Sequence, residues 1–191
     1  VAVDRIAGQD DLDNSIIQLM LCSPEMPRLE VEVRGDELKV GPRFSVSFIR
    51  TLRIPDDGRT YPLPAGLGRF PIARVQDHRA RVPEAWRDHG GVIIPMYQRE
   101  ALWLRFGGDH HKPNAVKVGV GKVDALTGDP FTMDLAADPQ NYLVTPQQPW
   151  LDGINAGDGM IRQFVAMPLG TGVTVEGQVT GEERFGGIQL V

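Results

Sequence analysis

Short runs in which apolar and polar residues alternate recur along the chain, and glycines and prolines separate them. The clearest example is LEVEVRGDELKV at 29–40, where apolar residues alternate with charged ones on both sides of RGDE. Because successive side chains of a strand point to opposite faces, each such run fits a strand with one buried face. A turn at Gly35 and Asp36 would join the two halves, so this segment is predicted to be a β-hairpin.

Further strand patterns lie at 44–54, 91–95, 101–106, 115–123, 141–146, 160–167, 172–180 and 186–191. Short glycine-containing links join the last three of these segments, which predicts an antiparallel meander. Many short strands separated by turn residues are typical of all-β proteins. The pattern therefore predicts a mainly β fold, an antiparallel β-sandwich or a jelly-roll-like arrangement with one or two short helices.

Helix signals are few. Residues 83–91, PEAWRDHGG, begin with Pro83 and end with Gly90 at the position of a C-cap, so they predict a short helix. The segment 10–21 starts with acidic residues that suit a helix N-terminus, yet its apolar block fits a buried strand equally well, and both alternatives stay open. Residues 54–83, rich in proline and arginine, are predicted to form an ordered excursion packed on the sandwich.

One arginine falls on an apolar face. Strict alternation in 44–54 places Arg50 on the same face as Phe48 and Leu52. A guanidinium on such a face must be paired, reach solvent at an edge or serve a ligand. We expect structural pairing.

Composition is that of an ordinary globular domain. The chain has 191 residues, of which 41% are hydrophobic and 24% charged, so we expect a single domain over 1–191. No apolar run approaches the roughly 18–20 residues that a membrane-spanning helix needs. The sequence starts at Val1 and ends inside a predicted strand, and we therefore expect it to be part of a longer chain.

Charge and cysteine content narrow the classes of partner and compartment. The net charge is -5, with a basic centre at 41–124 and acidic ends. The arginines of the centre are scattered singly, without interleaved aromatic residues, so nucleic-acid binding is not favoured. Cys22 is the one cysteine, which excludes an intrachain disulfide, and its apolar neighbours predict a buried structural thiol. A chain without disulfides favours a reducing compartment, here the cytoplasm.

The motifs of several large enzyme classes are missing from the sequence. It contains no GxGxxG, GxxxxGK[ST], HExxH or GxSxG pattern. None of its four serines stands in a nucleophile setting. A nucleophilic hydrolase is therefore not expected, and an enzyme is not the leading interpretation.

Two adjacent histidines are a candidate metal site. In GGDHHKPN, the residues Asp109, His110 and His111 combine ligand types that transition metals accept. Neighbouring residues of a strand point to opposite faces, so both histidines reach one metal only if the backbone turns between them. Glu100 could approach from the preceding strand. A polar loop without metal explains the same residues.

The stretch QPWLDGINAGDG at 148–159 is a candidate ligand loop. Trp150 offers a stacking face for a sugar, and Asp152, Asn155 and Asp158, with Arg162 just beyond, offer polar partners. Calcium accepts such oxygens too, but the ligand order of an EF-hand loop is missing. A strand connection with Asx turns is the simplest alternative. No cofactor is predicted; calcium or a transition metal remain the alternatives at these two places.

Long strings of the second half resemble segments of an uncharacterised bacterial protein family. The strings are PWLDGINAGDG and RQFVAMPLG above all, with GGVIIPMYQREALWLRF and PNAVKVGVGKVDALTG. The resemblance implies a bacterial origin and supplies no catalytic residue.

Three functional interpretations follow. The leading one is a binding or assembly module that recognises carbohydrate or another polar ligand through Trp150, Asp152, Asn155, Asp158 and Arg162. The second is a metal-dependent enzyme built on His110, His111 and nearby carboxylates. The third is a structural or protein-interaction domain that forms homo-oligomers through strand edges.

Overall fold

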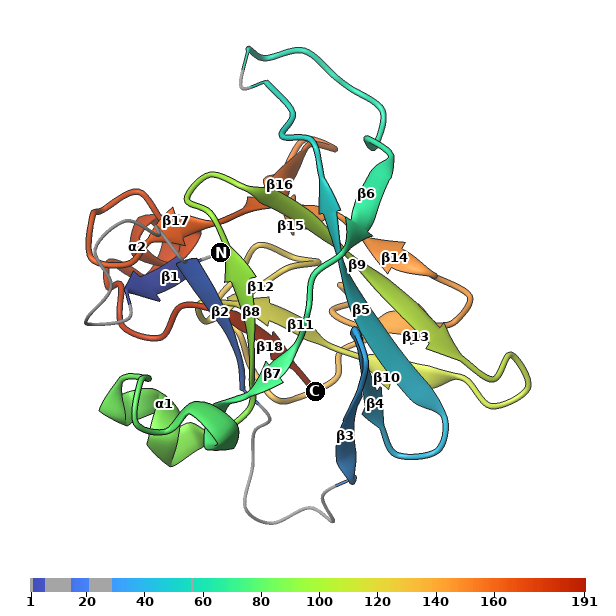
Figure 1. Ribbon diagram of the computed structural model, residues 1–191. Helices are drawn as coiled ribbons and strands as arrows, with labels where there is room; N and C mark the ends of the chain where they lie inside the picture. Colours follow the sequence, from blue (N-terminus) through green and yellow to red (C-terminus); the bar gives the residue numbers. More distant parts are fainter. Residues whose placement is uncertain (1, 6–14, 21–28, 56) are drawn as a thin grey trace.

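The fold is mainly β, as predicted. The structure is a computed structural model, and it describes residues 2–5, 15–20, 29–55 and 57–191 (Figure 1). Two large sheets and one two-stranded ladder contain the strands, and the described part of the chain adds two short α-helices and one 3₁₀ turn. None of its helices has the length and apolar character to cross a membrane.

The first sheet is antiparallel throughout and has the order β15-β16-β9-β5-β4-β3, with β14 beside β9 and β6 beside β5. Its strands are β3 (Val31–Arg34), β4 (Glu37–Val40), β5 (Phe44–Thr51), β6 (Gly66–Arg69), β9 (Ala101–Gly108), β14 (Trp150–Leu151), β15 (Gly153–Asn155) and β16 (Ile161–Val165). The predicted hairpin at 29–40 is confirmed, because β3 and β4 pair with Arg34 opposite Glu37. Gly35 takes a φ of 59° at the first turn position, which glycine adopts without strain.

The second sheet has the order β12-β11-β18-β2-β1-β17, with β8 pairing β2 and β7 pairing β8. Its strands are β1 (Ala2–Arg5), β2 (Ser15–Met20), β7 (Ala73–Arg74), β8 (Val92–Met96), β11 (Val118–Val120), β12 (Val123–Asp124), β17 (Met167–Pro168) and β18 (Ile188–Leu190). The pairs β1–β17 and β2–β18 are parallel, and the others in this sheet are antiparallel.

The open alternative for 10–21 is settled for the residues that the structure describes. Residues 15–20 form β2, which pairs with β1, β8 and β18. Cys22, the predicted buried thiol, lies outside the described residues.

One hydrophobic core joins the two large sheets. Phe48, Leu104 and Phe164 contribute to it from the first sheet, and Ile94 and Ile188 contribute from the second. All five side chains are at most 1% exposed. Val46 and Phe48 of β5 are buried, but so are Ser45 and Ser47 on its other face, and the prediction that Leu52 lies on the apolar face is wrong. Leu52 is 62% exposed because β5 ends at Thr51.

The proline- and arginine-rich segment 54–83 joins both sheets in its second half, whereas residues 57–60 are exposed. Residues 54–83 contribute β6 to the first sheet and β7 to the second, followed by a 3₁₀ turn, η1 (Val75–His78). The predicted helix at 83–91 is confirmed as α1 (Glu84–His89), with Gly90 at its C-cap. Trp86 of α1 packs with residues of η1 and β8 in a second, smaller core.

The prediction of a strand at 172–180 is wrong, because residues 175–180 form helix α2 (Val175–Thr180). Thr174 caps its N-terminus: the Gly177 N–H donates to Thr174 Oγ1 at 3.1 Å. Gly181, with a φ of 78°, ends it in the left-handed conformation. The predicted meander is therefore wrong too: β16 pairs with β15 and β9, whereas β18 pairs with β11 and β2.

The capping hydroxyl gives a first prediction. Thr174→Ala leaves the Gly177 N–H without its acceptor, and should lower the free energy of unfolding by about 1–2 kcal/mol. Urea denaturation followed by circular dichroism measures this loss. Thr60→Ala, at an exposed threonine, is the matched control and should change stability little. Equal stability of the two variants would contradict the role of the cap.

Candidate functional site

A buried ion pair lies where the segment 115–123 passes from the two-stranded ladder to the second sheet. The sequence pattern predicted one strand here, but the structure has β10 (Asn114–Val116), which pairs with β13 (Leu143–Thr145), followed by β11 and β12. Lys117 lies between β10 and β11 with its side chain fully buried. Its Nζ is 3.4 Å from Asp124 Oδ2, and the Asp124 side chain is 3% exposed.

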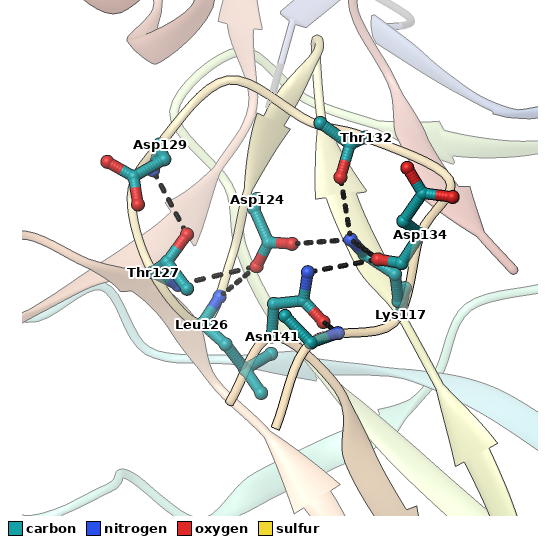
Figure 2. A network of polar contacts seen from close by, with 9 residues as sticks. Lys117, Asp124, Leu126, Thr127, Asp129, Thr132, Asp134 and Asn141 are labelled. Atoms are coloured by element: carbon teal, nitrogen blue, oxygen red, sulfur yellow. Dashed lines mark hydrogen bonds and ion pairs between the residues drawn. The ribbon is translucent and has the colours of Figure 1, made fainter. Parts of the chain in front are cut away.

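The Lys117 ammonium also holds the long loop after β12. Its Nζ donates to the Asp134 carbonyl oxygen at 2.9 Å and to Thr132 Oγ1 at 3.4 Å (Figure 2). Asn141 closes the same loop, because its Nδ2 donates to the Asp134 carbonyl oxygen and its Oδ1 accepts from Ala136 N. A buried charge must be met by such partners, since water cannot solvate it.

Asp124 orients the beginning of that loop. Its Oδ1 accepts from the N–H groups of Leu126 at 2.9 Å and Thr127 at 3.3 Å. Thr127 Oγ1 in turn accepts from Asp129 N at 3.2 Å. The Asp124 carboxylate thus fixes the beginning of the turn at 126–129, and Thr127 Oγ1 holds its end (Figure 2).

Removal of the lysine should be costly. Lys117→Met leaves the Asp124 carboxylate buried without its cation, and we expect a loss of about 3–5 kcal/mol in the free energy of unfolding. The double variant Lys117→Met/Asp124→Asn should recover part of this loss, because no lone charge remains. Urea denaturation measures both, with Lys112→Met at an exposed lysine as the control. A double variant less stable than Lys117→Met would argue against an electrostatic cause.

The turn at 126–129 forms one wall of a pocket of about 380 Å³, called here the α2 pocket. The other walls are the end of β15 with the residues after it, Arg162 of β16, and α2. The lining residues are Val123, Thr127, Gly128, Asp129, Ile154, Asn155, Ala156, Gly157, Arg162, Val175, Gln178 and Val179.

The pocket contains two of the five predicted ligand residues. Asn155 Nδ2 donates to the Leu126 carbonyl oxygen at 2.8 Å, and its Oδ1 accepts from Gly157 N at 2.9 Å, which is an Asx turn. Arg162 Nη1 donates to Gln178 Oε1 of α2 at 3.1 Å. Sequence reasoning missed α2 because its valines also fitted a strand.

The other three predicted residues do not line the α2 pocket. Trp150 lies on β14 beside β9 and is 45% exposed. Asp152 is partly buried, and its carbonyl oxygen accepts from Phe164 N. Asp158 is exposed in the following turn with a φ of 51°. The predicted constellation is therefore divided between the pocket and its surroundings.

The predicted metal residues lie in an exposed turn between β9 and β10. Asp109 Oδ1 accepts from His111 N at 2.9 Å, which makes another Asx turn. Glu100 does not approach them as a free ligand, because its Oε1 accepts from Arg50 Nε at 2.6 Å. The expected structural pairing of Arg50 is confirmed. Within the described ranges, no three His, Cys, Asp or Glu side chains gather as a metal site would require.

Two glutamates hold α2 in place. The buried Glu176 carboxylate accepts from Phe185 N at 2.9 Å and from Gly186 N at 2.7 Å. Glu183 Oε1 accepts from Thr174 N at 2.9 Å and from Thr174 Oγ1 at 2.5 Å. Partial desolvation acts to raise the pKa of Glu183, but hydrogen bonds from Thr174 and from Gly172 and Gly170 outweigh it and lower the pKa from 4.5 to about 2.

The lowered pKa predicts how stability depends on pH. Because the folded protein favours ionised Glu183, its contribution is complete above about pH 4.5 and is lost as the pH falls towards 2. The difference in unfolding free energy between wild type and Glu183→Gln should therefore shrink across this window. Urea denaturation from neutral to acidic pH measures it, and Glu182→Gln at an exposed neighbour is the control. A difference that stays constant with pH would contradict the assignment.

Comparisons of the chain with models of protein families, with curated proteins and with solved structures found no match.

Proposed function

We propose that this chain is a binding module whose α2 pocket takes a small polar ligand. One observation carries the proposal: the pocket gathers hydrogen-bonding groups from separate elements around apolar side chains. The polar side chains are Thr127, Asp129, Asn155, Arg162 and Gln178, and the apolar ones are Val123, Ile154, Val175 and Val179. Apolar walls with a few polar groups are typical of small-molecule sites, and about 380 Å³ is in their usual range.

The walls of the pocket are fixed before a ligand arrives, which supports the proposal. Asp124 holds the turn at 126–129 on one side, and Glu176 and Glu183 hold α2 on the other. A ligand therefore has little backbone to order on binding, and less of its interaction free energy is lost to conformational entropy.

Carbohydrate belongs to the proposed ligand class, but the aromatic stacking expected for it does not fit this pocket. Trp150 lies outside the lining, so a sugar in the α2 pocket would depend on hydrogen bonds to groups such as Asn155 and Gln178. Sugars therefore belong in the ligand panel beside charged compounds.

A pocket-filling variant tests the proposal. Val179 lines the pocket and is 44% exposed, so Val179→Trp should occupy the cavity without disturbing the core. A ligand found in a thermal-shift panel of sugars, amino acids and nucleotides should raise the Tm of the wild type, and Val179→Trp should abolish that rise. At a ligand concentration of 100 Kd the stabilisation lost is about 2.7 kcal/mol.

The matched control is Val173→Trp, because Val173 is similarly exposed, at 46%, and does not line the pocket. It should respond to the ligand as the wild type does. Unchanged binding to Val179→Trp would contradict the proposed site, and a panel without any ligand for the wild type would count against the proposed function.

A further inference from the structure

Two opposite charges line the α2 pocket without neutralising each other. Arg162 and Asp129 are both exposed, and neither makes an ion pair within the part of the chain that the structure describes. Elsewhere in the first sheet, Arg50 and Glu100 are joined directly at 2.6 Å. The pocket therefore presents a cation and an anion as separate binding groups.

Arg162 keeps most of its donors for a ligand. Its single hydrogen bond among the described residues runs from Nη1 to Gln178 Oε1 at 3.1 Å. A guanidinium has five N–H donors in a planar fork, and the remaining ones match the two oxygens of a carboxylate. Gln178 orients the fork without cancelling its charge.

Asp129 is held by its backbone, which leaves its carboxylate open. Its N–H donates to Thr127 Oγ1, and its carbonyl oxygen accepts from Asp124 N. In Figure 2 the carboxylate points away from the Lys117–Asp124 pair, so the buried lysine does not compensate it.

A ligand that fills this pocket removes water from both charges. A purely anionic ligand would satisfy Arg162 but would meet the Asp129 carboxylate with like charge, and a neutral ligand would leave both charges poorly solvated. A ligand that carries a carboxylate and an ammonium compensates both at once.

We propose, on the basis of the proposed function, that the ligand is a zwitterion: a free α-amino acid with its carboxylate on Arg162 and its ammonium on Asp129. The apolar lining from Ile154, Val175 and Val179 then receives an apolar side chain. The ammonium and the carboxylate, which the ligand carries on one Cα, thus contact side chains from two different walls of the pocket.

Isothermal titration calorimetry with four probes tests this assignment: l-leucine, N-acetyl-l-leucine, l-leucinamide and d-glucose. The wild type should bind l-leucine, and loss of either charge on the ligand should weaken binding at least roughly tenfold, as expected for charge-assisted hydrogen bonds. Asp129→Asn and Arg162→Gln should each weaken l-leucine binding similarly. Arg105→Gln, at an exposed arginine outside the pocket, is the matched control and should bind as the wild type does.

Pairing each variant with each probe makes the test specific. Asp129→Asn should bind N-acetyl-l-leucine about as weakly as l-leucine, because the partner of the ammonium is already lost. For the corresponding reason, Arg162→Gln should bind l-leucinamide about as weakly as l-leucine. The assignment would be overturned if replacing l-leucine by N-acetyl-l-leucine lowered the affinity of Asp129→Asn as much as it lowers the affinity of the wild type.

Different binding results would contradict the zwitterion proposal and the proposed function. Binding of d-glucose but not l-leucine, with d-glucose binding lost in Val179→Trp, would overturn the zwitterion and leave the proposed function standing. Absence of binding by all four probes and by the wider panel would overturn both.

Discussion

The buried pair of Lys117 and Asp124 is the constraint on which the pocket side of the molecule depends. An ammonium without access to water needs acceptors, and the chain supplies them from the loop at 125–142. The same demand makes Asp124 collect N–H donors from the turn at 126–129. One pair of charges thereby orders a loop that contains little regular secondary structure of its own.

Hydrogen bonds from backbone N–H groups to two carboxylates, rather than an ion pair, hold the opposite wall of the pocket. Glu176 and Glu183 bind backbone N–H groups rather than a cation, so they fix the segments before and after α2 by charge-assisted hydrogen bonds. A helix of six residues is too short to be stable by propensity alone. Its capping residue, these two carboxylates and the packing of Val175 against the core therefore stabilise it.

Between these walls Arg162 and Asp129 line the pocket without an ion pair among the described residues, whereas Arg50 of the first sheet is paired. Arg50 stacks on the ring of Phe70 at 4.3 Å and binds Glu100, and these contacts account for it structurally. The proposal that the α2 pocket binds a ligand depends on this pair of charges together with the apolar lining. In the proposed ligand, the adjacent ammonium and carboxylate would match these two side chains, and an apolar side chain would match the lining.

Local pattern determined much of the fold. Alternation located the hairpin at 29–40 and the strands β5, β8 and β9, because the period of two is a property of the strand itself. Capping residues located α1 for the same reason, since proline and glycine restrict only their own neighbourhood. The candidate loop at 148–159 was found from its polar residues, and Asn155, with Arg162 just beyond it, proved to line the pocket.

Tertiary structure decided what depends on contacts between distant segments. Residues 172–180 have valine spacing that fits a strand, but long-range carboxylate contacts and the Thr174 cap stabilise a helix. Lys117 occupies an ordinary polar position in its run of alternating residues. Only in the folded chain does the loop at 132–134 lie against its ammonium and accept its hydrogen bonds. The pocket joins Asp129 to Arg162 across segments that are far apart in sequence. The sequence by itself located the hairpin at 29–40, the strands β5, β8 and β9, and the helix α1. Packing determined which polar side chains meet, because burial and hydrogen bonding are properties of the whole fold.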